Sequence, residues 1–129
     1  RAGERADRSQ LYRDLADGPF FGHNRRHDVS QGLRDAFWLQ GTASGHRAAH
    51  ECIAAFSATD FRPDLAAVDV PTLVIHGDDD QIVPFPVGGE RTAALVADAK
   101  LLVYAGSGHA LPDTDRDRLH ADLLAFIES

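Results

Sequence analysis

The clearest structural signal in the chain lies at residues 70–84, Val70-Pro-Thr-Leu-Val-Ile-His-Gly-Asp-Asp-Asp80-Gln-Ile-Val-Pro84. The apolar run at residues 72–76 follows a proline and ends in a polar turn. Such a run is typical of a strand that is covered on both faces, as in a parallel sheet. The segment therefore predicts a buried strand whose carboxyl end carries an acidic turn.

A second unit of the same kind follows. Residues 88–97 predict a helix and residues 100–104 predict a second buried strand, which leads into Gly106-Ser-Gly-His109. Two strands joined through a helix form a parallel βαβ unit. A final helix is indicated by apolar side chains at positions i, i+4, i+7 and i+8, namely Leu119, Leu123, Phe126 and Ile127.

Residues 1–68 predict a helical, cap-like segment. Helices are expected at residues 6–17, 30–40 and 44–58. We expect Gly41 to end the second helix, Ser44 to cap the third, and Asp113 or Thr114 to cap the final helix. The predicted fold class is thus α/β, in which the helical segment is followed by a parallel βαβα unit at residues 69–129.

Two strands alone make a poor sheet. A parallel pair is rarely stable and leaves backbone groups unpaired at both edges. We therefore expect further strands, either from another chain or from sequence that is no longer present. The start on Arg1, without methionine, suits an excised domain or a processed product.

Two residues with acid–base chemistry follow the two strands, Asp80 after the first and His109 after the second. Adjacent parallel strands lie about 4.8 Å apart and end at the same edge, so the two turns can bring these side chains within hydrogen-bonding distance. A carboxylate that accepts the Nδ1 proton of a histidine fixes the tautomer that a general base requires. Acid before base is the order of the last two members of a Ser-Asp-His triad, although the sequence contains no Gly-x-Ser-x-Gly nucleophile motif.

Other interpretations of the polar residues stay open. The turn Asp78-Asp-Asp80 is also compatible with a solvated turn or with a loose cation site. His46 and His50 have the i, i+4 spacing of zinc ligands, but no third ligand is evident and surface histidines are the expected alternative. His76 is expected to support packing or the neighbouring site rather than act as the base. We expect no bound metal and no cofactor.

Three aromatic residues, Phe20, Phe21 and Trp38, are candidates to line a substrate pocket. Phe20 and Phe21 fall in a loop, where large apolar rings must be covered or must line something. Pocket walls are mostly apolar. Trp38 and its neighbour Phe37 are equally expected as core residues of the helical segment.

Composition excludes several classes of partner. The 129 residues are 43% hydrophobic and 26% charged, as in one globular domain. The net charge of −7 disfavours nucleic acid and anionic membrane surfaces, and Arg25-Arg-His27 reads as a solvated turn. Without a transmembrane run or a signal segment, the protein is expected in the cytoplasm. The lone Cys52 excludes an internal disulfide and is expected to be a buried structural thiol, with a nucleophilic thiol as a minor alternative.

Several motifs spread over nearly the whole chain belong together. They are Asp17-Gly-Pro-Phe-Phe-Gly22, Val29-Ser-Gln-Gly32, Phe37-Trp-Leu-Gln-Gly41, His50-Glu-Cys-Ile-Ala-Ala-Phe-Ser57, Thr59-Asp-Phe61, Asp69-Val-Pro-Thr-Leu-Val-Ile-His-Gly77, Asp80-Gln-Ile-Val-Pro84 and Ala121-Asp-Leu-Leu-Ala-Phe-Ile127. In these motifs the chain resembles the cofactor-free (non-haem) chloroperoxidase and arylesterase group of α/β-hydrolases.

This resemblance implies a helical cap over the active site, Asp80 as the catalytic acid and His109 as the catalytic base. It places the nucleophilic serine and both oxyanion-hole donors upstream of this sequence. The loop that usually reads Pro-His-Gly in the family reads Gly108-His-Ala110 here, which leaves the base in place.

The sequence therefore predicts the C-terminal portion of a serine hydrolase, an esterase or perhydrolase of small esters or carboxylic acids, which is inactive without the upstream nucleophile. The alternative is a non-catalytic, excised or degenerate domain that serves as an oligomerisation or binding module. Self-association through the open sheet edge is expected.

Overall fold

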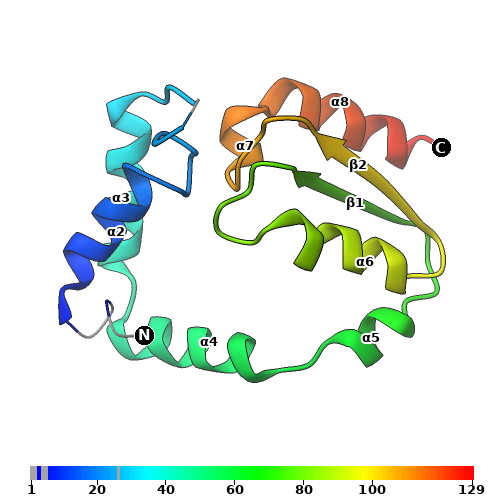
Figure 1. Ribbon diagram of the computed structural model, residues 1–129, viewed down its shortest axis with the longest axis horizontal. Coiled ribbons are helices and arrows are strands. Elements are labelled where there is room, and N and C mark those ends of the chain that lie inside the picture. The colour runs from blue at the N-terminus through cyan, green and yellow to red at the C-terminus, as the bar shows by residue number, and fades with distance from the viewer. Residues whose placement is uncertain (1–2, 4–5, 26) are drawn as a thin grey trace.

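A pair of parallel strands organises the C-terminal half. In the computed structural model, which describes residues 3, 6–25 and 27–129, β1 (Thr72–Gly77) pairs with β2 (Ala99–Tyr104) in parallel. The register runs from Thr72 opposite Ala99 to Gly77 opposite Tyr104, so both strands end at the same edge. Helix α6 (Gly89–Leu95) lies on one side of the strands and α8 (Arg116–Ile127) on the other (Figure 1). The predicted α/β class and the parallel βαβα unit are confirmed.

The expected burial of β1 on both faces is wrong within the described part of the chain. Its side chains from Thr72 to His76 are only half-buried, and Gly77 alone is fully buried. In the described residues the sheet has two strands, so β1 has a hydrogen-bonded neighbour along one edge only.

The helical half comes first. Its elements are α2 (Arg8–Ala16), α3 (Gln31–Ala43), α4 (His46–Ala58) and α5 (Arg62–Ala66). Helices α2 and α3 run side by side, and α4 and α5 lead from them to β1 (Figure 1). The carboxylate of Asp7 and the hydroxyl of Ser30 cap α2 and α3 by accepting from backbone N–H groups of the first turn. No helix in the described ranges is long and apolar enough to cross a membrane.

Gly41 and Ser44 do not have the helix-ending and helix-capping roles expected from the sequence. Helix α3 continues past Gly41 to Ala43, because Gly41 serves packing and not termination: a Cβ there would lie 2.5 Å from Tyr12 Cδ1 on α2. Ser44 closes α3 by donating to the Gly41 carbonyl oxygen at 2.8 Å, and Gly45 precedes α4 without a side-chain cap. The buried position expected for Cys52 is also wrong, since this residue of α4 is exposed.

The segment after β2 holds a short helix that the sequence did not indicate. Helix α7 (Leu111–Thr114) includes the two residues expected to cap the final helix, and Asp115 stands at the start of α8 instead. A single turn of 3-10 helix, η1 (Phe85–Val87), precedes α6 in the same way.

One small apolar core joins the helical half to the loop after β2. Phe21, Ala16 and Ala110 are buried together, and Phe21 is only 1% exposed. The half-buried residues packed around them are Phe20, Val29, Leu33 and Phe37. Because Ala110 follows His109 directly, this core holds the histidine loop against the helices.

Candidate active site

Asp80 and His109 are in direct contact. His109 Nδ1 lies 2.8 Å from Asp80 Oδ2, although the residues are 29 positions apart in sequence. An ionised carboxylate only accepts hydrogen bonds, so in the neutral ring Nδ1 carries the proton and Nε2 has a lone pair. The structure thus brings together the two residues that the sequence placed after successive parallel strands.

Backbone groups hold the Asp80 carboxylate from its other side. Asp80 Oδ1 accepts from the N–H groups of Ile82 and Val83, both at 2.8 Å. The side chain is only 5% exposed. A buried carboxylate with this set of donors has one orientation, which directs Oδ2 to His109.

The three consecutive aspartates face three different partners. Asp78 accepts from the Gly106 N–H at 2.5 Å, and the Asp79 carboxylate pairs with the Arg25 guanidinium. Only Asp80 meets the histidine. Their carboxylates do not converge on one point, and no group of three or more His, Cys, Asp or Glu in the described residues could hold a metal ion.

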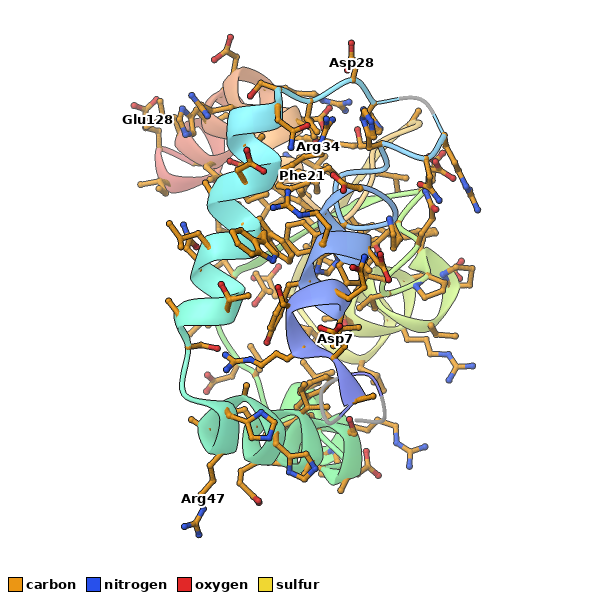
Figure 2. The ribbon with its side chains drawn as sticks, turned by 90° about the vertical axis from the view of Figure 1, so that its left-hand side faces the viewer. Asp7, Phe21, Asp28, Arg34, Arg47 and Glu128 are labelled. Carbon is orange, nitrogen blue, oxygen red and sulfur yellow. The ribbon has the colours of Figure 1, made fainter. Side chains whose placement is uncertain are left out.

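Phe20 lies against His109. The two ring centroids are 5.3 Å apart in an edge-to-face arrangement. Phe20 also packs on Phe21 at 5.0 Å and on Phe37 at 4.1 Å. The His109 side chain keeps one third of its surface exposed, so the aromatic cluster bounds one side of the imidazole and leaves part of it accessible. In Figure 2, Phe21 lies beside α3, where Leu33 and Phe37 pack against it.

Trp38 is not brought to this cluster. Its Nε1 donates to the Ser9 carbonyl oxygen at 3.1 Å, and the Arg13 guanidinium lies 4.5 Å from its ring, so Trp38 packs on α2. Neighbouring residues of a helix point about 100° apart, and it is Phe37 that faces Phe20.

The loop between α2 and α3 contacts the turn that follows β1 and the loop that follows β2. Arg25 pairs with Asp79, Asn24 donates to Gln81 at 3.1 Å, and His27 Nε2 donates to the Gly106 carbonyl oxygen at 2.8 Å. Arg25 lies in an exposed turn, as expected, although its guanidinium pairs with Asp79; His27 is half-buried, and Arg26 lies outside the described residues.

Gly77 and Ser107, whose packing role the sequence did not indicate, set the distance between the turns. A Cβ on Gly77 would lie 2.6 Å from the Ser107 carbonyl carbon, so only glycine allows the approach. The Ser107 carbonyl oxygen accepts from the Asp79 N–H at 3.1 Å. The Gly-Ser-Gly run before His109 was the available signal for this close backbone packing.

The comparison with known proteins decides the family. The model of the α/β hydrolase fold family matches residues 3–115, most of the chain. The chain belongs to the α/β-hydrolase fold family.

The chain is similar to proteins that are named as peroxidases or as an esterase/perhydrolase. It is 52% identical over 124 residues to a non-heme haloperoxidase from Rhodococcus erythropolis, covering 95% of this chain and 45% of the relative. It is 49% identical to a non-heme chloroperoxidase from Streptomyces lividans, covering 100% of this chain and 47% of that protein. A bifunctional esterase/perhydrolase from Acinetobacter calcoaceticus is 44% identical over 95% of this chain and 45% of its own length.

The fold of the chain also matches a solved structure closely. The crystal structure of bromoperoxidase from Bacillus anthracis matches with a TM-score of 0.94 and 33% identity, over 99% of this chain and 46% of that one. The chain spans about half the length of the relatives it matches.

Proposed function

We propose that this chain supplies the acid and the base of a Ser-His-Asp triad in an ester hydrolase. The observation that carries the proposal is the 2.8 Å hydrogen bond between His109 Nδ1 and Asp80 Oδ2, with the carboxylate fixed by two further donors. In this role Asp80 holds the tautomer and stabilises the imidazolium, and His109 Nε2 is the atom that exchanges protons.

The reaction follows from these roles. A serine Oγ bonds to the ester carbonyl carbon and gives its proton to His109 Nε2, which passes it to the departing alcohol. Water then attacks the acyl-enzyme by the same route and releases the acid. Where hydrogen peroxide takes the place of water, the product is a peracid. Small esters and carboxylic acids are therefore the proposed substrates, and the name of one relative, a bifunctional esterase/perhydrolase, supports them.

The chain as printed holds no Gly-x-Ser-x-Gly, so we propose that it is inactive by itself. Hydrolysis of p-nitrophenyl acetate by the 129-residue chain should not exceed the rate of free imidazole. A rate well above that background, abolished by His109→Ala, would contradict this part of the proposal.

The triad roles are tested in the longer protein. The coding region directly upstream should contain an in-frame Gly-x-Ser-x-Gly, and the protein that includes it should hydrolyse p-nitrophenyl acetate. There, Asp80→Asn should lower kcat by about 10³–10⁴-fold through the wrong histidine tautomer. Asp79→Asn, which changes the neighbouring carboxylate, should keep kcat within a few-fold. Equal effects of the two substitutions would count against Asp80.

A second candidate function, self-association, is favoured by the exposed apolar residues. Phe56, Phe61, Val70 and Val87 all have large exposed side chains, and β1 has only β2 as a partner in the described residues. An unpaired strand edge is a template for another strand. Size-exclusion chromatography with light scattering should show dimers or larger species that grow with concentration. A monomer at all concentrations would remove this candidate.

A further inference from the structure

A second histidine lies against the Asp80 carboxylate. His76 Nε2 is 3.4 Å from Asp80 Oδ2, the same oxygen that accepts from His109. His76 sits near the end of β1, and its side chain is 14% exposed. Neither of the triad roles proposed above uses this imidazole.

The tautomer of His76 follows from its nearest partner. His76 Nε2 lies 2.9 Å from the Val83 carbonyl oxygen, which only accepts hydrogen bonds. Nε2 therefore carries the proton in the neutral ring. Since His109 carries its proton on Nδ1, the two histidines that meet Asp80 Oδ2 are opposite tautomers.

His76 and Asp80 hold the same residue by its two backbone groups. The Val83 N–H donates to Asp80 Oδ1 at 2.8 Å, while the Val83 carbonyl oxygen accepts from His76. This chain of hydrogen bonds ties the turn that orients Asp80 back to β1. Without the histidine, the turn would be fixed to the strand at one end only.

The His76 ring is itself held by packing. A Cβ on Gly89 would lie 2.7 Å from His76 Cβ, and one on Gly88 would lie 3.0 Å from His76 Cε1. The Phe85 ring centroid is 5.6 Å from that of His76. The start of α6 thus packs closely against the His76 side chain and restricts the ring to one orientation.

We propose that His76 is a positioning residue for the Asp80–His109 pair: by holding Val83 and approaching Oδ2, it keeps the Asp80 carboxylate directed at His109 Nδ1. This inference rests on the proposed function of Asp80 and His109. It assigns His76 no contact with substrate.

The experiment reads the tautomers of both histidines directly. Long-range ¹H–¹⁵N spectra of the labelled chain identify which ring nitrogen is protonated, at a pH about two units above the ordinary imidazole pKa of about 6.5. In the wild-type chain His109 should be protonated at Nδ1 and His76 at Nε2. The His76→Gln amide reaches the place of Nε2 and should leave His109 fixed. The His76→Asn amide is too short for it, so His109 should become a mixture of tautomers.

The possible results separate the role of His76 from the proposed function. His109 still wholly protonated at Nδ1 in His76→Asn, with the fold retained by circular dichroism, would overturn the role of His76 and leave the proposed function untouched. His76 protonated at Nδ1 in the wild type would overturn it without any variant, which covers the case of a variant that does not fold. A wild-type His109 not protonated at Nδ1 would instead count against the proposed function. His50→Phe on α4 is the control, and it should leave the signals of both His109 and His76 unchanged.

Discussion

Ser107 and Asp115 join the loop that carries His109 to the start of α8. The Ser107 hydroxyl donates to Asp115 Oδ1 at 2.9 Å, and Ser107 is only 3% exposed. The second oxygen of the Asp115 carboxylate accepts from the Thr114 hydroxyl at 2.7 Å. The Asp79 N–H also donates to the Ser107 carbonyl oxygen. Ser107 therefore links the turn after β1, the loop that carries His109 and helix α8.

Removal of the Ser107 hydroxyl should cost stability. Ser107→Ala leaves a partly buried carboxylate oxygen without its donor, so the free energy of unfolding should fall by about 1–2 kcal/mol. Urea unfolding followed by circular dichroism measures the change. The control is Ser57→Ala, which removes an exposed hydroxyl bonded to a carbonyl of its own helix and should stay within about 0.5 kcal/mol. Equal effects would mean that Ser107 does not tie the loop.

A side chain at Gly77 should separate the two turns that carry Asp80 and His109. The Cβ in Gly77→Ala would meet the Ser107 backbone, which cannot move aside without breaking its hydrogen bond to Asp79. We expect a loss of about 2–4 kcal/mol in the free energy of unfolding.

The matched control is Gly32→Ala on α3. The nearest atom to a Cβ there is Ser30 Oγ at 4.0 Å, so the space is open. Alanine in a helix should then stabilise the protein by about 0.5–1 kcal/mol. Urea unfolding of both variants should give changes of opposite sign, and a neutral Gly77→Ala would contradict the close approach.

The two strands, the longer helices and the meeting of Asp80 with His109 followed from sequence because their signals are local. Apolar runs of strand length marked β1 and β2, and the parallel geometry placed Asp80 and His109 at one edge. The sequence did not indicate which of the three aspartates contacts His109. The partners of Asp78 and Asp79 come from loops 28 and 54 positions away in the chain.

The misassigned positions were decided by contacts between segments. Glycine often ends a helix, yet at Gly41 the Tyr12 ring occupies the space that a side chain would fill. Phe37 and Trp38 are equally apolar in sequence, and only the placement of α2 and the loop after it decides which one faces Phe20. Tertiary packing therefore overrode local preference at these positions.

Tyr104 should make the protein sensitive to alkaline pH. Burial raises the pKa of Tyr104 to about 12, and the hydrogen bond that its hydroxyl donates to Asp122 at 2.6 Å adds to the rise. In the unfolded chain the pKa is about 10. Between these values the unfolded chain releases a proton that the folded chain keeps, so the free energy of unfolding should fall as the pH rises from 10 to 12.

Urea unfolding across this range should show the fall in the wild type and a weaker one in Tyr104→Phe. The variant should be less stable below pH 10, where the bond to Asp122 is intact in the wild type. Tyr12→Phe, which alters a ring between α2 and Gly41, should keep the alkaline fall. Identical profiles for wild type and Tyr104→Phe would show that another group is responsible.

An amide at position 80 should switch the tautomer of His109. In Asp80→Asn the amide oxygen takes over the N–H groups of Ile82 and Val83, and its NH₂ then faces His109. His109 Nδ1 must now accept a hydrogen bond, which moves the ring proton to Nε2 and removes the lone pair that the proposed base role of His109 requires. Long-range ¹H–¹⁵N spectra should show this reversal with a stability loss of about 1–2 kcal/mol. Asp79→Asn should leave His109 protonated at Nδ1. The same Nδ1 protonation in Asp80→Asn would mean that residue 80 does not govern the imidazole.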